Sequence, residues 1–238
     1  MDAMPLTVAG VGFVLGLRHA LDPDHVVAVS ALVSERAGVR RSTLVGALWG
    51  LGHALSLTLA GSVILVLKLS APMVLARALE SLVALMLVGL GAAAVRGALR
   101  YRLHAHAHAH GGREHVHVHS HRRDESPSHG HRHPLGSGLK PFLVGLVHGL
   151  AGSAGLALLA LGTAPSLPTG LAYIALLGAG SVFGMVALSL LMGLPLAMLE
   201  ARYAFVHRRV QLAAGASSVL LGLWLLGQHA LAIAVPAP

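Results

Sequence analysis

Long apolar runs recur along the chain, and each is about as long as a bilayer crossing requires. A membrane-spanning helix needs about 20 mostly apolar residues, and six stretches reach that length. They lie at 6–33, 43–67, 74–99, 139–162, 169–198 and 210–234. The pattern therefore predicts an all-α polytopic membrane protein with six transmembrane helices.

Composition excludes a soluble domain and several kinds of site. Only 11% of the 238 residues are charged and 55% are hydrophobic, whereas soluble domains carry about 25% charged residues. Mean hydropathy is +0.74. The chain has no cysteine, which excludes disulfides, thiolate metal sites and iron–sulfur clusters. Its net charge is +8, but without a nucleic-acid-binding motif the excess indicates membrane topology, and we expect no nucleic-acid partner.

The basic residues are distributed unevenly about the predicted spans. Fourteen of the 17 Lys and Arg lie in the segments after the first, third and fifth spans, and only Lys68 and Arg77 lie on the other side. Cytoplasmic loops of membrane proteins carry the excess of Lys and Arg. This predicts a protein of the cytoplasmic (inner) membrane, with both termini outside and the central loop, 101–138, in the cytoplasm.

Two parts of the chain resemble each other. Residues 14–32 align with 143–161 at a shift of 129 with seven of 19 positions identical, including a shared G-L-x-H-x-L core. A weaker similarity places 50–53 over 178–181. We interpret this as a 3+3 inverted repeat of 1–100 and 139–238, a design of many secondary transporters. The alternative is chance similarity between two helices rich in Gly, Ala and Leu.

The first span contains an ionisable cluster, RHALDPDH at 18–25. Each ionisable group at membrane depth costs about 2.5–3.5 kcal/mol on insertion scales and is functional by default. Pro23 should break the helix, because it lacks an N–H and clashes with the preceding turn. Imidazoles with carboxylates suit Ni²⁺, Co²⁺, Zn²⁺ or Mn²⁺, and the alternative is a structural ion pair. The candidate metal ligands here are His19, Asp22, Asp24 and His25.

Two further histidines lie inside apolar spans, His53 in G-L-G-H and His148 in G-L-V-H-G. Taken alone, each histidine is as consistent with an interhelical hydrogen bond as with a metal ligand. However, His148 aligns with His19 in the repeat, so a site formed between the two halves would bring these residues together. We therefore add His53 and His148 to the candidate metal ligands. The candidate lining residues are Arg18, Ser153 and Ser181.

The central loop is rich in histidine, with alternating runs such as HAHAHAH and HVHVHSH. Such tracts are typical of metal binding, and a polar linker of biased composition is the alternative. We expect the loop to be disordered without metal and to concentrate, buffer or sense cytoplasmic metal. The auxiliary ligands are His104, His106, His108, His110, His115, His117, His119, His121, His129, His131 and His133.

The H-x4-D-H motif of His19, Asp24 and His25 resembles that of the nickel/cobalt transporter family, NiCoT, and Gly52-His53 is similar to its second motif. HGLAGSAG, which begins at His148, more closely resembles the related UreH-like and NicO nickel permeases. Typical NiCoT members have eight spans with the motif in the second, whereas six are predicted here with the motif in the first. The resemblance implies transport of Ni²⁺ or Co²⁺.

These observations predict a permease that moves Ni²⁺, and also Co²⁺, by uptake through the His/Asp site. The membrane potential favours entry of a divalent cation by about 4.6 kcal/mol per 100 mV, twice the value for one charge. We expect no enzyme activity and no cofactor, since the metal is the substrate. The expected partners are the metal ion, the lipid bilayer, and a cytoplasmic metallochaperone or a second copy of the chain. The alternatives are an efflux transporter, a non-transporting metal sensor or urease-assembly partner, and a membrane enzyme with a buried metal.

Overall fold

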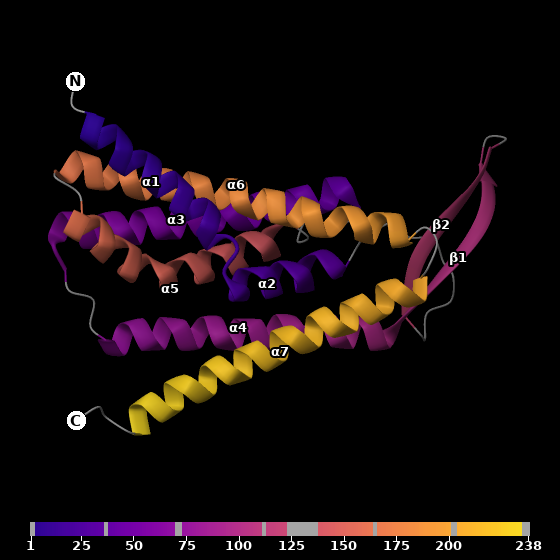
Figure 1. Ribbon diagram of the computed structural model, residues 1–238. Coiled ribbons are helices and arrows are strands. Elements are labelled where there is room, and N and C mark those ends of the chain that lie inside the picture. The colour runs from indigo at the N-terminus through magenta and orange to yellow at the C-terminus, as the bar shows by residue number, and fades with distance from the viewer. Residues whose placement is uncertain are drawn as a thin grey trace.

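The computed structural model describes residues 3–35, 38–69, 73–110, 113–122, 138–163, 166–200 and 204–234. Helices make up most of this part of the chain, in a bundle with a two-stranded hairpin at one end (Figure 1). The elements in chain order are α1 (Ala3–His19), α2 (Pro23–Ser34), α3 (Val39–Leu67), α4 (Met73–Arg100), β1 (Tyr101–His110), β2 (Arg113–Arg122), α5 (Leu139–Thr163), α6 (Leu167–Glu200) and α7 (Ala204–Ala234).

Four stretches of the described helices are long and apolar enough to cross a membrane. They are Val39–Leu67, Val74–Leu99, Leu167–Met198 and Phe205–His229. Large apolar side chains such as Leu59, Leu191 and Leu220 are exposed on the outside of the bundle, where a bilayer would cover them. The protein is therefore a multi-pass helical membrane protein.

The first predicted span is interrupted between His19 and Pro23. The chain turns there through hydrogen bonds from the Leu21 N–H to the Arg18 carbonyl (2.9 Å) and from the Asp22 N–H to the His19 carbonyl (3.1 Å). Asp22 has extended backbone angles, as expected for a residue before proline, and Pro23 begins α2, where its missing N–H costs nothing. The predicted break is confirmed, and it lies near the middle of the bundle (Figure 1).

The central loop differs from expectation. Its composition predicts disorder without metal, but β1 and β2 form an antiparallel hairpin over most of 101–122. Alternation of one residue type with Ala or Val is a strand pattern, and antiparallel pairing satisfies the backbone groups. The all-α expectation applies to the bundle but not to this loop. The paired positions include His104 with His119, His106 with His117, and His108 with His115. His129, His131 and His133 lie outside the described residues.

Two helix crossings, α1 with α6 and α3 with α5, form much of the bundle's interior. At the first crossing, a Cβ on Gly16 would overlap the carbonyl oxygen of Leu177, and a Cβ on Gly180 would overlap that of Phe13. Small residues allow the backbones of membrane helices to approach this closely. These glycines therefore set the spacing between α1 and α6.

The crossing of α3 with α5 depends on glycine in the same way. A Cβ on Gly145 would overlap the carbonyl oxygen of Trp49, and a Cβ on Gly52 would overlap that of Phe142. Because Trp49 and Gly52 lie within one turn of His53, this close approach also places His53 against α5.

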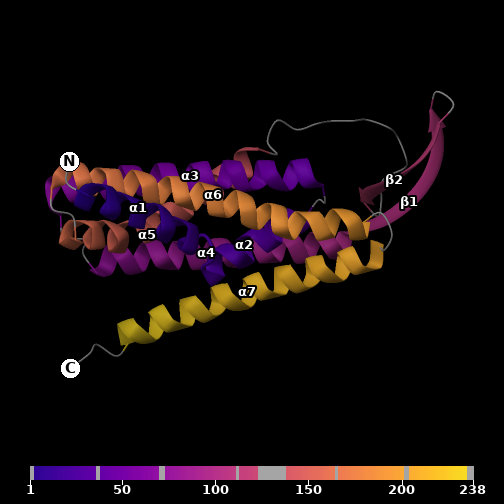
Figure 2. The same ribbon diagram turned by 45° about the horizontal axis from the view of Figure 1, so that its top comes forward.

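The remaining helices complete the bundle around α2. α4 packs against α7 along one side, and α2 contacts α4, α6 and α7. The first turn of α1 and the last turn of α7 lie at the end of the bundle opposite the hairpin (Figures 1 and 2). The broken segment thus packs against several helices, and at its break Ala20 and His25 are buried while Leu21 is exposed.

Candidate metal centre

The break brings two imidazoles together that a continuous helix would separate. His19 is the last residue of α1, and His25 lies in the first turn of α2. Their ring centroids are 4.6 Å apart, with the planes at 70°. The interruption at Pro23 is therefore what makes the two ends of the H-x4-D-H motif neighbours.

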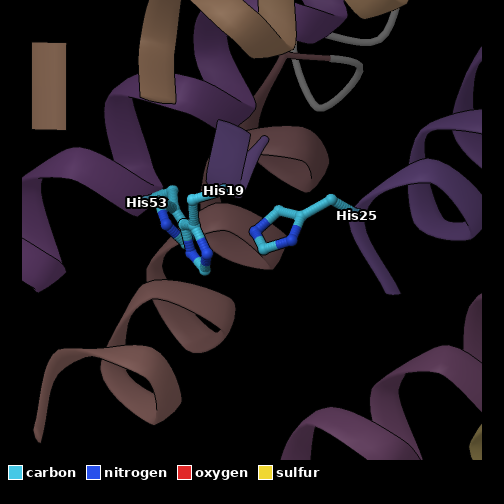
Figure 3. Close-up of side chains that lie close together, drawn as sticks. All are labelled: His19, His25 and His53. Carbon is cyan, nitrogen blue, oxygen red and sulfur yellow. The ribbon is translucent and has the colours of Figure 1, made fainter. Parts of the chain in front are cut away.

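His53 completes a group of three imidazoles. It is the central residue of α3, with 14 residues on each side, and its ring centroid lies 5.3 Å from that of His19 and 5.0 Å from that of His25. The three rings converge (Figure 3), and one ligand nitrogen from each lies within 4.8 Å of the others. His25 and His53 are buried, and His19 is nearly so.

Each histidine of the motif has a carboxylate beside its Nδ1. His19 Nδ1 lies 2.8 Å from Asp22 Oδ2, and His25 Nδ1 lies 3.1 Å from Asp24 Oδ1. The backbone N–H of His25 also donates to Asp24 Oδ1, at 2.9 Å. The Asp22 side chain makes no capping hydrogen bond to α2, so its described role is the contact with His19.

The second half of the chain contributes His148, from α5. Its Nε2 lies 2.9 Å from Asp24 Oδ2, and its ring stacks on His25 with centroids 4.1 Å apart and planes at 15°. Asp24, His25 and His148 form a second group whose ligand atoms lie within 4.8 Å of one another. Asp24 thereby connects α2 with α5.

Several buried ring nitrogens in this centre have no hydrogen-bond partner among the described residues. They are Nε2 of His19, Nε2 of His25, both ring nitrogens of His53, and Nδ1 of His148. A buried polar atom without a partner costs about 1–3 kcal/mol. Four rings with such nitrogens lie in one place, and each can offer a lone pair when it is neutral.

The structure brings together all six predicted ligands: His19, Asp22, Asp24, His25, His53 and His148. That they bind metal remains a prediction. Arg18 is exposed on α1. Ser181 is buried at the α1–α6 crossing, where it donates to the Leu177 carbonyl (2.9 Å) and also contacts the Gly16 carbonyl (3.3 Å). Ser153 lies in α5, but its side chain is outside the described part of the structure.

Sequence reasoning missed Trp49. Its ring lies against His25, with centroids 5.4 Å apart, and against His148, at 5.9 Å. It is fully buried. Residues four apart share a helix face, so its position one turn before His53 is the signal that could have identified it.

The bundle and its centre define a class of protein: a multi-pass helical membrane protein with a group of His and Asp side chains gathered inside it. Comparison with known sequences gives the family. The model of the NicO family, described as high-affinity nickel-transport protein, matches residues 6–154, a range that contains all six predicted ligands. The chain belongs to this family, so the resemblance found in the sequence is confirmed.

A curated relative covers almost the whole chain. "Urease accessory protein UreH" of Bacillus sp. (strain TB-90) is 34% identical over 218 residues, which are 92% of this chain and 90% of the relative. No solved structure matches the chain.

Proposed function

We propose that the protein is a permease for Ni²⁺, and also for Co²⁺, in the cytoplasmic membrane. The observation that carries this proposal is the group of imidazole nitrogens around His53, which have no hydrogen-bond partner in the described part of the chain, inside a member of a nickel-transport family. Imidazole suits Ni²⁺ among the divalent ions. The ion would pass through the centre formed by His19, Asp22, Asp24, His25, His53 and His148, which gives the chain a transport role and no enzymatic one.

We also propose six membrane passes, with α1 and α2 together forming the first, arranged as a 3+3 inverted repeat. The two crossings at which glycines allow close approach support this arrangement, because they are equivalent by residue number. Adding 129 to a residue number in α1 gives its counterpart in α5, and subtracting 128 from a residue number in α6 gives its counterpart in α3. α1 and α5 also run in opposite directions (Figure 1). The equivalent contacts are Gly16–Leu177 with Gly145–Trp49, and Gly180–Phe13 with Gly52–Phe142.

The same relation applies within the central pair of helices, α3 and α6. A Cβ on Gly50 would contact Val182, and a Cβ on Gly178 would contact Ala54. A shift of 128 exchanges these two contacts, which supports an axis of the proposed repeat between α3 and α6. In transporters of this design the substrate site lies near the midplane, where the repeats meet, and the contact between Asp24 and His148 is such a meeting point.

Uptake is the direction that the physics favours. With the hairpin end in the cytoplasm, as the Lys and Arg distribution indicates, the membrane potential draws a divalent cation inward by about 4.6 kcal/mol per 100 mV. Import then needs no coupling ion. The name of the UreH relative favours a second candidate, a urease-assembly partner that does not itself transport. Efflux would need an opposing ion gradient.

Nickel accumulation in cells tests this proposal. Cells that express the wild type or His25→Ala are incubated with radioactive nickel, and His229→Ala is the matched control, because His229 pairs with Glu80 (3.1 Å) on α4 and α7. We expect import to appear as lower accumulation with His25→Ala and unchanged accumulation with His229→Ala. Higher accumulation with His25→Ala would indicate export, and no change would contradict transport through this centre.

A further inference from the structure

The carboxylates determine which nitrogen of each motif histidine is free. An ionised carboxylate only accepts hydrogen bonds, so the Nδ1–H of His19 donates to Asp22 and the Nδ1–H of His25 donates to Asp24. Each neutral ring then has its lone pair on Nε2. Both Nε2 atoms are buried without a partner among the described residues, so both rings present a ligand atom to the interior.

Asp24 has little capacity left for an ion. Its Oδ1 accepts from the backbone N–H and the Nδ1–H of His25, and its Oδ2 accepts from the Nε2–H of His148. A carboxylate has about four lone-pair positions, and three are occupied. Direct binding of an ion by Asp24 would require the hydrogen bond that orients His25 or the contact with α5 to be broken.

His148 is not arranged to share an ion with His25. A ring nitrogen binds metal through the lone pair in the plane of its ring. Because the rings of His25 and His148 are nearly parallel and 4.1 Å apart, a single ion cannot lie in both planes. The rings of His19, His25 and His53, by contrast, are inclined to one another at 38° to 77°.

We propose that the ion in this conformation is bound by three imidazoles, those of His19, His25 and His53, and that Asp22 and Asp24 are positioning residues that do not touch it. This inference rests on the proposed function. Metal–nitrogen bonds of about 2.1 Å place ligand atoms up to about 4.2 Å apart, so a group within 4.8 Å needs only a small adjustment. A carboxylate on the far nitrogen of a metal-bound histidine is the usual arrangement.

The arrangement also balances charge. Three neutral imidazoles bring no charge to a divalent ion, and the two outer carboxylates together supply two negative charges. A charge in a low-dielectric interior is costly unless it is paired. The centre thus favours a divalent ion over a monovalent one, and its nitrogen ligands favour Ni²⁺ or Co²⁺ over Mg²⁺ or Ca²⁺.

X-ray absorption spectroscopy of bound Ni²⁺ tests this ligand set by counting imidazoles. The full-length protein is purified with the eleven loop histidines replaced by Asn, so that only the bundle offers imidazole clusters, and is loaded with substoichiometric Ni²⁺. We expect three imidazoles, with water oxygens completing the shell. A carboxylate in the shell, two or fewer imidazoles, or a fourth from His148 would overturn the proposal, and this measurement needs no substitution within the bundle.

Substitutions then separate positioning from binding. We expect Asp22→Asn and Asp24→Asn to keep three imidazoles while the Kd for Ni²⁺ weakens about 10- to 100-fold, because the amide oxygen of Asn still accepts the Nδ1–H. Asp24→Ala should bind more weakly than Asp24→Asn, and His19→Ala should show two imidazoles. Glu80→Gln, at the remote His229 pair, is the matched control and should bind as the parent does. Loss of an oxygen ligand with either Asn variant would contradict the proposal.

Nickel flux in proteoliposomes, measured on the same preparations, distinguishes this inference from the proposed function. Three imidazoles without flux would refute the permease and leave the ligand assignment intact. Flux with a carboxylate in the shell would refute the ligand assignment and leave the permease intact.

Discussion

His53 has the most unusual environment of any single residue described. Its side chain is fully buried at the centre of α3, and neither ring nitrogen has a hydrogen-bond partner among the described residues. Structural histidines in membrane helices form interhelical hydrogen bonds, which His53 does not do here. A role as a ligand explains why this side chain is buried without a hydrogen bond. A purely structural role does not explain it.

Replacement of His53 by Leu separates these two roles. We expect His53→Leu to abolish nickel flux and the nickel-induced rise in Tm, while the metal-free Tm is unchanged or higher, because the unpaired nitrogens cost about 1–3 kcal/mol. Thermal unfolding of the purified protein with and without Ni²⁺ measures this. His229→Leu, which removes a paired histidine, should lower the Tm slightly and keep the flux. A large fall in the metal-free Tm of His53→Leu with normal flux would show that His53 is structural.

The sequence identified these residues because ionisable groups are rare in apolar spans. The spacing and the proline alone predicted that His19, Asp24 and His25 lie together, which is what the structure shows, whereas their binding of metal stays a prediction. Which nitrogen each ring presents could not be predicted, because the tautomer depends on a contact in space. Trp49 was harder to find, because an aromatic residue in an apolar helix carries little chemical contrast, and only its position one turn before His53 points to it.

Among the elements, the interrupted first span matters most for the centre. In a continuous helix, His19 and His25 would be separated by a rise of about 9 Å and a rotation of about 240°, and their rings could not meet. The break shortens this separation to a ring contact of 4.6 Å. The geometry of the site therefore depends on the residue that prevents helix formation.

Restoring the helix should disperse the ligands. Pro23→Ala removes a residue that costs about 3 kcal/mol inside a helix, so we expect α1 and α2 to join and the Kd for Ni²⁺ to weaken at least tenfold, with the protein still inserted in the membrane. Isothermal titration of the loop-substituted protein measures this. Unchanged affinity would show that the break survives without proline or that the ligands do not depend on it.

The glycine crossings should tolerate no added methyl group. We expect Gly145→Ala to lower the Tm by several degrees and to reduce flux, because its Cβ would overlap the backbone of α3 at Trp49. Gly89→Ala is the control: nothing lies within 4 Å of the added Cβ, and Ala favours a helix by about 1 kcal/mol. If both variants behaved alike, close approach at Gly145 would not be what sets the α3–α5 spacing.

The hairpin should affect how much metal binds and leave transport intact. With the eleven loop histidines replaced by Asn, we expect fewer Ni²⁺ ions bound per chain and unchanged flux in proteoliposomes. Loop binding in the wild type should weaken as the pH falls from 7.5 to 5.5, because metal binding needs neutral imidazole and protons compete with the metal for the ring nitrogens. Equilibrium dialysis across this pH range measures the stoichiometry. Loss of flux in the substituted protein would place the loop on the transport route.

At the scale of the whole molecule, apolar run length predicted four helices that are long enough to cross a membrane, Val39–Leu67, Val74–Leu99, Leu167–Met198 and Phe205–His229. Run length and helix length agree there because both are set by the same requirement, burial in hydrocarbon. The six passes as a whole stay a proposal. The hairpin was not foreseen, since a polar, His-rich composition indicates disorder while its alternation indicates strands. How the halves pack was also beyond the sequence, because it depends on backbone contacts at particular glycines.

We propose that the ion crosses between the two halves of the chain at a centre to which both halves contribute. Asp24 is the residue that joins them. It lies in α2 beside His25, and its carboxylate contacts His148 in α5. The claim is about movement of the ion across the membrane, which binding measurements alone do not address.

Nickel flux into proteoliposomes of purified protein tests this claim most directly. With the interior held negative by a potassium gradient, we predict that wild-type protein accumulates Ni²⁺, that His25→Ala abolishes the accumulation, and that His229→Ala leaves it unchanged. Accumulation should rise with the size of the imposed potential. Absence of flux in the wild type, or equal flux with His25→Ala, would contradict the account.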